Sequence, residues 1–258
     1  MNAFHFKYMT VNSPERLESL LTESKLWFPS PTCFNDPNEF RFHLRAPKQK
    51  SIIRKQYFAD HSEAVEEDFE SWYRMVSWKS WPQYQEGFIR RDLSSLGVLC
   101  LSTTCRNPIM WAHYADGHAG ICVAFNSGFL AEVDNLILAE SVLYRKRLPR
   151  VKYFGEDRTE VIRKLVLTKY SDWAYEREFR VITSHGNTAK QIAQTSIDGI
   201  ILGTNISREK EDRILGIIGK RQSPIKVFRA RLSYLTYEME ITNFGSNGSS
   251  HAEIVDYL

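Results

Sequence analysis

Residues 96–125 have the sequence LGVLCLSTTCRNPIMWAHYADGHAGICVAF. Two apolar runs in it, LGVLCLSTT (96–104) and HAGICVAF (118–125), predict buried strands, because short and continuously apolar segments suit strands that are covered on both faces. The segment between them, NPIMWAHYADG (107–117), predicts a short helix that ends at Gly117. The strand–helix–strand order predicts a sheet with helices packed against it.

The rest of the chain adds strands and helices in irregular alternation. Further strands are predicted in FHFKYMT (4–10), LWF (26–28), EFRVITS (178–184), IDGIILG (197–203) and the closing segment 223–241. Further helices are predicted in SPERLESLLTESK (13–25), EVIRKLVLTKYSDWAYE (160–176) and SREKEDRILGIIGK (207–220). Residues 48–92 predict an aromatic-rich helical insertion, and residues 243–252 a flexible Gly/Ser-rich tail segment. We therefore expect one α+β domain over residues 1–258, with a mixed or antiparallel sheet and flanking helices.

The composition is that of an ordinary globular protein. The 258 residues are 43% hydrophobic and 25% charged, with a net charge of +3, which argues against a disordered or coiled-coil chain. The mean hydropathy is −0.38, and no apolar run approaches the ~20 residues of a membrane helix. We find no secretory signal and expect a soluble, cytoplasmic protein without membrane contact. The four cysteines have no CxxC spacing, so no disulfide framework and no metal site is expected.

Polar side chains follow two of the predicted elements. Asn35 and Asp36 precede a proline in FNDP (34–37), a pattern typical of a turn capped by its own side chains. Ser102 and Thr103 place hydroxyl groups at the end of the first buried strand. A structural role is favoured over ligand contact for the FNDP turn, because such turns are common, and the two hydroxyl groups alone do not indicate a function.

The predicted helix and the basic loop also allow two interpretations. Trp111 and Tyr114 have the spacing of ordinary helix packing, and His113 suits either a structural hydrogen bond or a ligand contact. Arg145 and Lys146 belong to the basic run YRKRLPRVK (144–152), which is either a solvated loop or a phosphate contact. A mildly basic pI near 8.6 permits a polyanionic partner without requiring one.

The string WAYEREFRV (173–181) contains the E-x-E pair Glu176 and Glu178. In a strand both carboxylates would point to one face, and like charges placed side by side destabilise each other unless a cation, a ligand or solvent compensates. Arg177 and Arg180 would supply this compensation in a structural interpretation. In a functional one, paired carboxylates serve a reaction that passes through a cationic sugar transition state.

Taken together, the strings FNDPNEF, LCLSTT, NPIMWAHYADGHAGICVAF and WAYEREFR resemble an uncharacterised family of bacterial proteins that is filed as a domain of unknown function. More remotely, the order of elements resembles the ADP-ribosyltransferase superfamily, which includes DarT-like toxins and poly-ADP-ribose polymerases. That resemblance implies a split sheet, NAD as the substrate, no metal, and a catalytic glutamate on a late strand.

The ADP-ribosyltransferase resemblance also assigns roles to residues. It implies Glu178 as the catalytic carboxylate and Glu176 as the group that orients or deprotonates the acceptor. NAD contacts are implied for residues of the first strand and of the central block, namely His5, Lys7, Tyr8, Ser102, Thr103, Trp111, His113 and Tyr114. Acceptor contacts are expected at Asn35, Asp36, Arg145 and Lys146. The first strand lacks a single clear family residue, so His5 and Lys7 are alternatives there.

The implied function is mono-ADP-ribosylation of RNA, DNA or protein by an intracellular bacterial toxin or phage-defence effector, with an antitoxin or immunity protein as a further partner. Two other functions remain open. A sensor module would bind a nucleotide in the same cleft without turnover. A metal-dependent nuclease would use converging carboxylates such as Asp36, Glu39 and Glu178.

Overall fold

The computed structural model describes residues 4–45, 49–76, 81–152 and 156–244. The predicted flexible segment 243–252 lies mostly outside the described residues. The strands are β1 (Phe4–Met9), β2 (Lys25–Phe28), β3 (His43–Arg45), β4 (Gly97–Ser102), β5 (Ile121–Asn126), β6 (Leu136–Ser141), β7 (Leu143–Arg145), β8 (Arg150–Lys152), β9 (Thr168–Tyr170), β10 (Glu178–Thr183), β11 (Thr188–Gln191), β12 (Ile197–Leu202), β13 (Lys226–Leu232) and β14 (Met239–Asn243). The α-helices are α1 (Pro14–Leu21), α2 (Lys50–Asp60), α3 (Glu66–Met75), α4 (Trp81–Ser95), α5 (Pro108–Tyr114), α6 (Arg158–Val166) and α7 (Arg208–Ile218).

The expected α+β class is confirmed by an eight-stranded, largely antiparallel sheet. Its order is β14-β13-β12-β5-β1-β4-β10-β6, with only β12 and β13 parallel. The sheet opens in the middle, because β1 and β4 share the single pair Phe6–Ser102, whereas β1 shares six pairs with β5 and β4 shares six with β10. The two halves of the sheet therefore diverge on either side of this one pair.

Three apolar clusters cover the sheet. Helices α1 and α7 pack on one face, with Leu17 and Ile214 among the buried residues. On the opposite face, α5 covers the half that contains β1 and β5, and α4 and α6 cover the half that contains β4 and β10. Because directly paired residues point to the same face, Phe6, Ser102 and Glu178 all lie on the face of these last two clusters, and Phe6 belongs to the cluster beside α5. The opening of the sheet is thus flanked by apolar packing on both sides.

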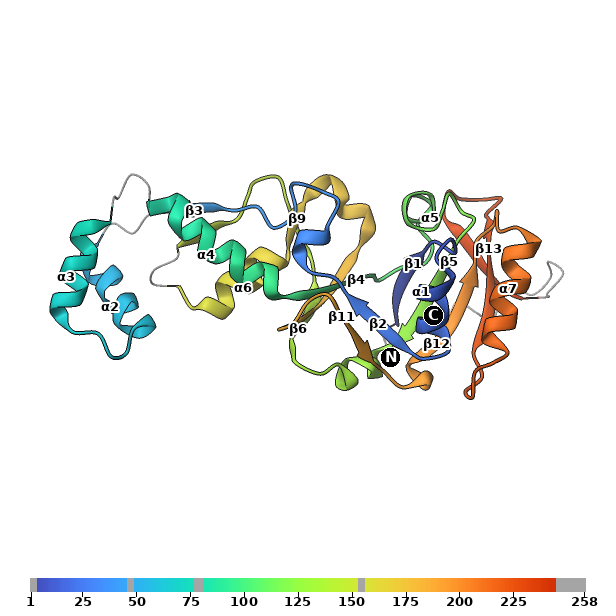
Figure 1. Ribbon diagram of the computed structural model, residues 1–258. Coiled ribbons are helices and arrows are strands. Elements are labelled where there is room, and N and C mark those ends of the chain that lie inside the picture. Colours follow the sequence, from blue (N-terminus) through green and yellow to red (C-terminus); the bar gives the residue numbers. More distant parts are fainter. Residues whose placement is uncertain (1–3, 46–48, 77–80, 153–155, 245–258) are drawn as a thin grey trace.

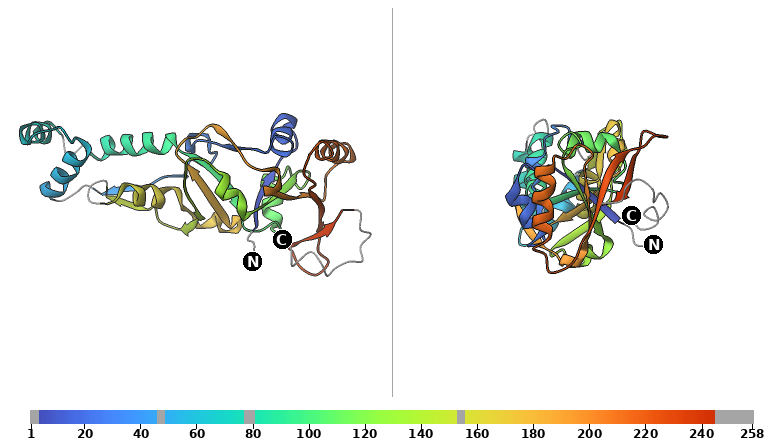
Figure 2. Two further views of the ribbon diagram at one scale, coloured as in Figure 1. Left: turned by 90° about the horizontal axis from the view of Figure 1, so that it is seen from below. Right: turned by 90° about the vertical axis from the view of Figure 1, so that its right-hand side faces the viewer.

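The predicted helical insertion forms one end of an elongated molecule. Figures 1 and 2 show α2 and α3 far from the sheet, with α7 at the other end. Phe69 is fully buried in a small cluster with Ile53 and Tyr57, and Trp72 packs against it. The aromatic residues described in this segment thus form a local core, as the large apolar area of their rings favours.

The segment 160–176 differs from its prediction. Helix α6 ends at Val166, and β9 and a 3-10 helix (Ser171–Glu176) follow instead of a continuous helix. Tertiary pairing overrides the helical pattern, because β9 pairs in parallel with β7, with Tyr144 opposite Lys169. This interruption brings Lys169 into the centre of the molecule.

Gly120 directly precedes β5 and lies too close to the neighbouring backbone to be replaced by a larger residue without a structural shift. A Cβ on Gly120 would lie 2.3 Å from the Met9 carbonyl oxygen and 2.8 Å from the Ala115 backbone. We expect Gly120→Ala to lower the unfolding free energy by about 1–3 kcal/mol, since the backbone must shift to relieve the overlap. Thermal unfolding measures the effect. Gly216→Ala in α7 is the matched control, because nothing lies within 4 Å of the added atom, and it is expected to raise the melting temperature slightly.

Candidate functional site

A pocket of about 230 Å³ occupies the opening between β1 and β4. We call it the acidic pocket. It is lined by residues from β1, from the turn after β2, from β4, from α5 and from the 168–178 segment, namely Phe6, Lys7, Tyr8, Phe34, Asn35, Asp36, Glu39, Cys100, Leu101, Ser102, Met110, Tyr114, Lys169, Trp173, Glu176 and Glu178. Segments that are far apart in the sequence thus meet at the point where the sheet splits.

Five charged side chains form a nearly buried cluster at the wall of this pocket. Glu39, Glu176 and Glu178 are 3–4% exposed, Lys169 is 10% exposed and Arg180 is fully buried. Lys169 Nζ lies 3.1 Å from Glu39 Oε1, 2.5 Å from Glu176 Oε2 and 3.0 Å from Glu178 Oε2. We call these five residues the charge cluster. Its three carboxylates and two cations leave one net negative charge.

Arg180 holds Glu178 in its ionised form. The guanidinium donates from Nε to Glu178 Oε1 (2.7 Å) and from Nη2 to both oxygens of Glu39 (2.9 Å each), and Nη1 donates to the Val166 carbonyl (2.7 Å). Burial would raise the pKa of Glu178, but Arg180 and Lys169 lower it to about 2. Glu178 is therefore a permanent negative charge at neutral pH.

Glu176 behaves differently although it is only two residues away. Its Oε1 accepts from the Tyr114 hydroxyl at 2.7 Å, and its Oε2 accepts from Lys169. Burial raises the pKa of Glu176 above its ordinary value, and the opposing effects of Lys169 and Tyr114 do not cancel that rise. The pair therefore combines one fixed anion with one carboxyl that gains a proton more readily, a division of roles typical of acid–base sites.

The two glutamates share a side of the molecule for a reason other than the predicted one. Glu176 is the last residue of the 3-10 helix, Arg177 is left-handed with φ of 46°, and Glu178 begins β10. A left-handed residue reverses the chain direction locally, so the carboxylates converge on Lys169 without continuous strand geometry. The Ser102 hydroxyl supports this turn by donating to the Glu176 carbonyl at 2.6 Å.

Helix α5 fixes the 3-10 helix in position. Asn107 caps α5 with its Oδ1 and donates from Nδ2 to the Tyr175 carbonyl at 2.6 Å. His113 Nδ1 contacts the Tyr175 hydroxyl at 3.1 Å, and Tyr114 bonds Glu176. The strand–helix block and the E-x-E string thus form one connected unit.

Lys7 contributes the remaining cation of the acidic pocket. Its ammonium donates one long bond of 3.4 Å to the Cys100 carbonyl, and among the described residues no carboxylate lies within ion-pair distance. Burial lowers the pKa of Lys7. This amine is thus available to a bound molecule.

Most of the predicted site residues meet in the acidic pocket. Glu176, Glu178, Lys7, Tyr8, Ser102, Tyr114, Asn35 and Asp36 all line it. Some are also structurally engaged, since Asp36 accepts from the Asn38 backbone at 2.8 Å as the FNDP turn predicts, and the Tyr8 hydroxyl donates to the Thr104 carbonyl at 2.9 Å. Of the two predicted compensating cations, only Arg180 pairs with the glutamates; Arg177 is exposed and forms no ion pair among the described residues.

Four predicted NAD contacts do not line the pocket. His5 is buried against Phe179, with ring centroids 4.0 Å apart, and Trp111 is fully buried and donates to the Cys105 carbonyl. Thr103 and His113 are exposed beside the pocket but do not line it. His5 and Trp111 are corrected to core residues, because flanking apolar side chains enclose them. The expected acceptor residues Arg145 and Lys146 line a separate groove next to the pocket.

Sequence reasoning did not assign Lys169, Trp173 or Phe34 to the site and considered Glu39 only for a metal. Lys169 lies in a segment whose periodicity predicts a helix. It contacts the three glutamates because this segment forms β9 instead. Lys169 Nζ also lies 5.3 Å from the centroid of the Trp173 ring. Trp173 lies three residues before Glu176, so its proximity to the glutamate pair could have been predicted. The structure is needed to show that its ring lines the acidic pocket.

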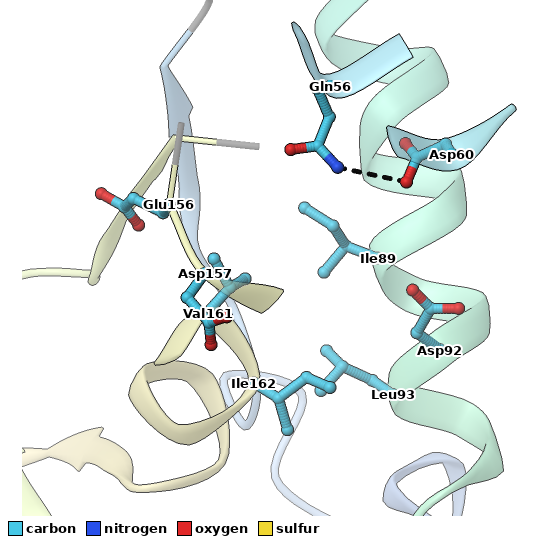
Figure 3. Close-up of a pocket in the computed structure, with 9 residues that line it drawn as sticks. All are labelled: Gln56, Asp60, Ile89, Asp92, Leu93, Glu156, Asp157, Val161 and Ile162. Carbon is cyan, nitrogen blue, oxygen red and sulfur yellow. Dashed lines mark hydrogen bonds between the residues drawn. The ribbon is translucent and has the colours of Figure 1, made fainter. Parts of the chain in front are cut away.

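A second cavity lies between α2, α4 and α6 and contains none of the predicted site residues (Figure 3). Its lining combines the apolar residues Ile89, Leu93, Val161 and Ile162 with Gln56, Asp60, Asp92, Glu156 and Asp157. Local contacts account for several of the polar groups, since Gln56 donates to Asp60, Asp157 caps α6, and Glu156 pairs with Lys164. Four carboxylates line this cavity, but its lining residues include no lysine or arginine that they could share as the glutamates of the acidic pocket share Lys169.

Part of the chain matches a known protein family. Residues 110–181 match the protein family of unknown function DUF2971. The expected resemblance to an uncharacterised family is thereby confirmed over less than a third of the chain. Searches of curated proteins and of solved structures found no match. None of these comparisons bears on the ADP-ribosyltransferase resemblance.

Six of the pocket residues lie in the DUF2971 segment, namely Met110, Tyr114, Lys169, Trp173, Glu176 and Glu178, and the remaining ones come from the chain before it. Within the described residues no group of three or more His, Cys, Asp or Glu side chains is arranged to hold a metal ion. The carboxylates Glu39 and Glu178, considered above for a metal, bond Lys169 and Arg180 instead. Across the described part of the chain, no helix combines the length and apolar character needed to cross a membrane.

Proposed function

We propose that this protein is an NAD-dependent ADP-ribosyltransferase that binds the nicotinamide riboside part of NAD in the acidic pocket. The observation that carries the proposal is the pair Glu176 and Glu178, held by Lys169 at the opening of the sheet beside the rings of Phe34, Tyr114 and Trp173. The net negative charge of the charge cluster and the aromatic rings of the acidic pocket both favour binding of a cationic pyridinium ring.

In the proposed reaction the bond between ribose C1′ and the nicotinamide nitrogen breaks, and its electron pair stays on the nicotinamide. An oxocarbenium-like transition state develops positive charge on the ribose. Glu178 stabilises this charge, because its low pKa keeps it ionised, and a fixed anion in a nearly buried site acts more strongly than one in water. The acceptor then bonds C1′, and its proton passes to Glu176, the carboxylate with the raised pKa.

Tyr114→Phe tests the role of Glu176 through the pH profile. The Tyr114 hydroxyl stabilises the ionised carboxylate, so its removal raises the pKa of Glu176 further. Since the reaction uses the ionised form, we expect the acidic limb of the rate profile to move to higher pH. Tyr8→Phe is the matched control, because Tyr8 lines the same pocket but donates to a backbone carbonyl, and it leaves the limb in place. An unmoved limb in Tyr114→Phe contradicts the role of Glu176.

The experiment that tests the proposal measures the release of nicotinamide from NAD by chromatography, in parallel samples with a chelator and with magnesium, and with RNA, DNA or a protein extract added in turn. Nicotinamide release that depends on one acceptor supports the transferase. NAD binding without release would identify a sensor module, and magnesium-dependent cleavage of nucleic acid without NAD consumption would identify a nuclease. An antitoxin would be sought as a protein that suppresses the release.

A further inference from the structure

A basic groove adjoins the acidic pocket and has not been given a ligand by the proposed reaction. The groove has a volume of about 360 Å³ and is lined by Asn38, Arg41, Arg145, Lys146, Arg147, Leu148, Pro149, Thr168, Lys169 and Tyr170. Lys169 lines both the groove and the acidic pocket, so the two cavities are neighbours. We call this second cavity the basic groove.

Among the described residues, four cations of the basic groove have no carboxylate partner, namely Arg41, Arg145, Lys146 and Arg147, whereas Lys169 is paired with the glutamates of the charge cluster. No carboxylate lines it, and among the residues that the structure describes Arg145, Lys146 and Arg147 form no ion pair. Arg41 donates to the neutral Asn38 side chain at 2.8 Å, and no carboxylate of the described residues pairs with it. By contrast, Arg54, Arg90 and Arg163 elsewhere on the surface each pair with a glutamate. The groove therefore concentrates positive charge that an anion must balance.

The alternation of side chains along the paired strands β7 and β9 explains why residues of this pair reach both the charge cluster and the basic groove. Tyr144 and Lys169 are paired residues, and both reach the charge cluster, where the Tyr144 hydroxyl accepts from the Glu178 backbone N–H at 2.8 Å. The next pair, Arg145 and Tyr170, alternates to the other side and lines the basic groove. Tyr170 is 47% exposed there and offers an aromatic face beside the cations.

We infer that the basic groove binds the phosphate groups of a nucleotide or nucleic acid whose reactive part lies at the acidic pocket. At about 230 Å³, the acidic pocket is smaller than the roughly 300–1,000 Å³ of clefts that enclose whole small molecules. A dinucleotide bound in the acidic pocket must therefore extend beyond it. Its phosphate groups bind most strongly to Arg and Lys side chains that have no other anionic partner. Phosphate binding by the groove stands without the proposed reaction; the assignment of the phosphates to NAD or to its acceptor rests on it.

The test measures binding alone and needs no turnover. The probes are inorganic pyrophosphate, ADP-ribose and a labelled single-stranded oligonucleotide, each titrated into the full chain. The groove variant is Arg145→Glu with Arg147→Glu, and the matched control is Arg16→Glu with Lys55→Glu, two exposed cations on α1 and α2. We expect the groove variant to bind pyrophosphate at least about tenfold more weakly than the wild type, and the control to bind within about twofold of it.

The other two probes identify the source of the phosphate. A parallel loss of ADP-ribose binding assigns the groove to the pyrophosphate of the dinucleotide, and a loss confined to the oligonucleotide and pyrophosphate assigns it to a nucleic-acid strand. The inference is overturned if the wild type binds none of the probes, if the groove variant binds all of them as the wild type does, or if both double variants lose affinity equally. Absence of nicotinamide release would contradict the proposed function and leave these outcomes unaffected.

Discussion

Arg180→Met is expected to lower the free energy of unfolding by about 3–5 kcal/mol. Arg180 is fully buried and donates to Glu178, Glu39 and the Val166 carbonyl. Methionine is uncharged and ends near the position of Nε, so two carboxylates that are 3–4% exposed lose their shared cation while Lys169 alone remains beside them. Denaturant unfolding followed by circular dichroism measures the loss.

The double variant Arg180→Met with Glu178→Gln separates lost packing from uncompensated charge. Removing the second charge relieves the penalty, so the double variant is expected to lose less stability than the sum of the two single variants. Acid unfolding gives a second readout. Because the folded-state pKa of Glu178 is lowered to about 2, its stabilising contribution is complete above its ordinary pKa of 4.5 and is lost as the pH falls toward 2. Strict additivity, or a stability of Arg180→Met equal to that of the wild type, contradicts the account of the cluster.

Glu178→Gln is expected to reduce nicotinamide release from NAD about 10²–10³-fold while NAD still binds. Glutamine keeps the shape and an acceptor oxygen, and Arg180 keeps its two bonds to Glu39, so the pocket is preserved. Only the fixed negative charge beside the developing cation is removed. Release is measured with labelled NAD, and binding by calorimetry.

The matched control for this variant is Glu140→Gln. Glu140 is a more exposed carboxylate that pairs with Arg163 outside the pocket, so its variant loses one charge without touching the site. It is expected to release nicotinamide at the wild-type rate. Full activity of Glu178→Gln with labelled NAD would remove Glu178 from the reaction, and equal losses in both variants would assign the effect to overall charge.

Local pattern predicted the elements that the site is built on. The apolar runs around residues 96–125 and 178–184 became β4, β5 and β10, because continuous or alternating hydrophobicity is sufficient to indicate a strand. The E-x-E spacing and the FNDP turn also directed attention to the residues that meet in the acidic pocket. Such signals are local, so a single sequence reveals them.

Local sequence pattern does not predict contacts between segments that are distant in the chain. Lys169 lay in a segment of helical periodicity, and only its pairing with β7 makes it the cation shared by three glutamates. His5 and Lys7 have the same strand parity, yet the opening of the sheet beside β4 exposes Lys7 to the pocket and leaves His5 in the core. The pairing of strands determines which side chains reach the pocket and which lie in the core. Local periodicity does not show which strands pair.

The most direct measurement of the central claim is a crystal structure of Glu178→Gln with bound NAD, in which slow turnover preserves the substrate. The account predicts the nicotinamide riboside in the acidic pocket, between Ser102 and residue 178, with its ring against Trp173 or Tyr114 and its ribose within hydrogen-bond distance of Glu176 or residue 178. A dinucleotide bound elsewhere, or an acidic pocket empty at saturating NAD, would contradict it.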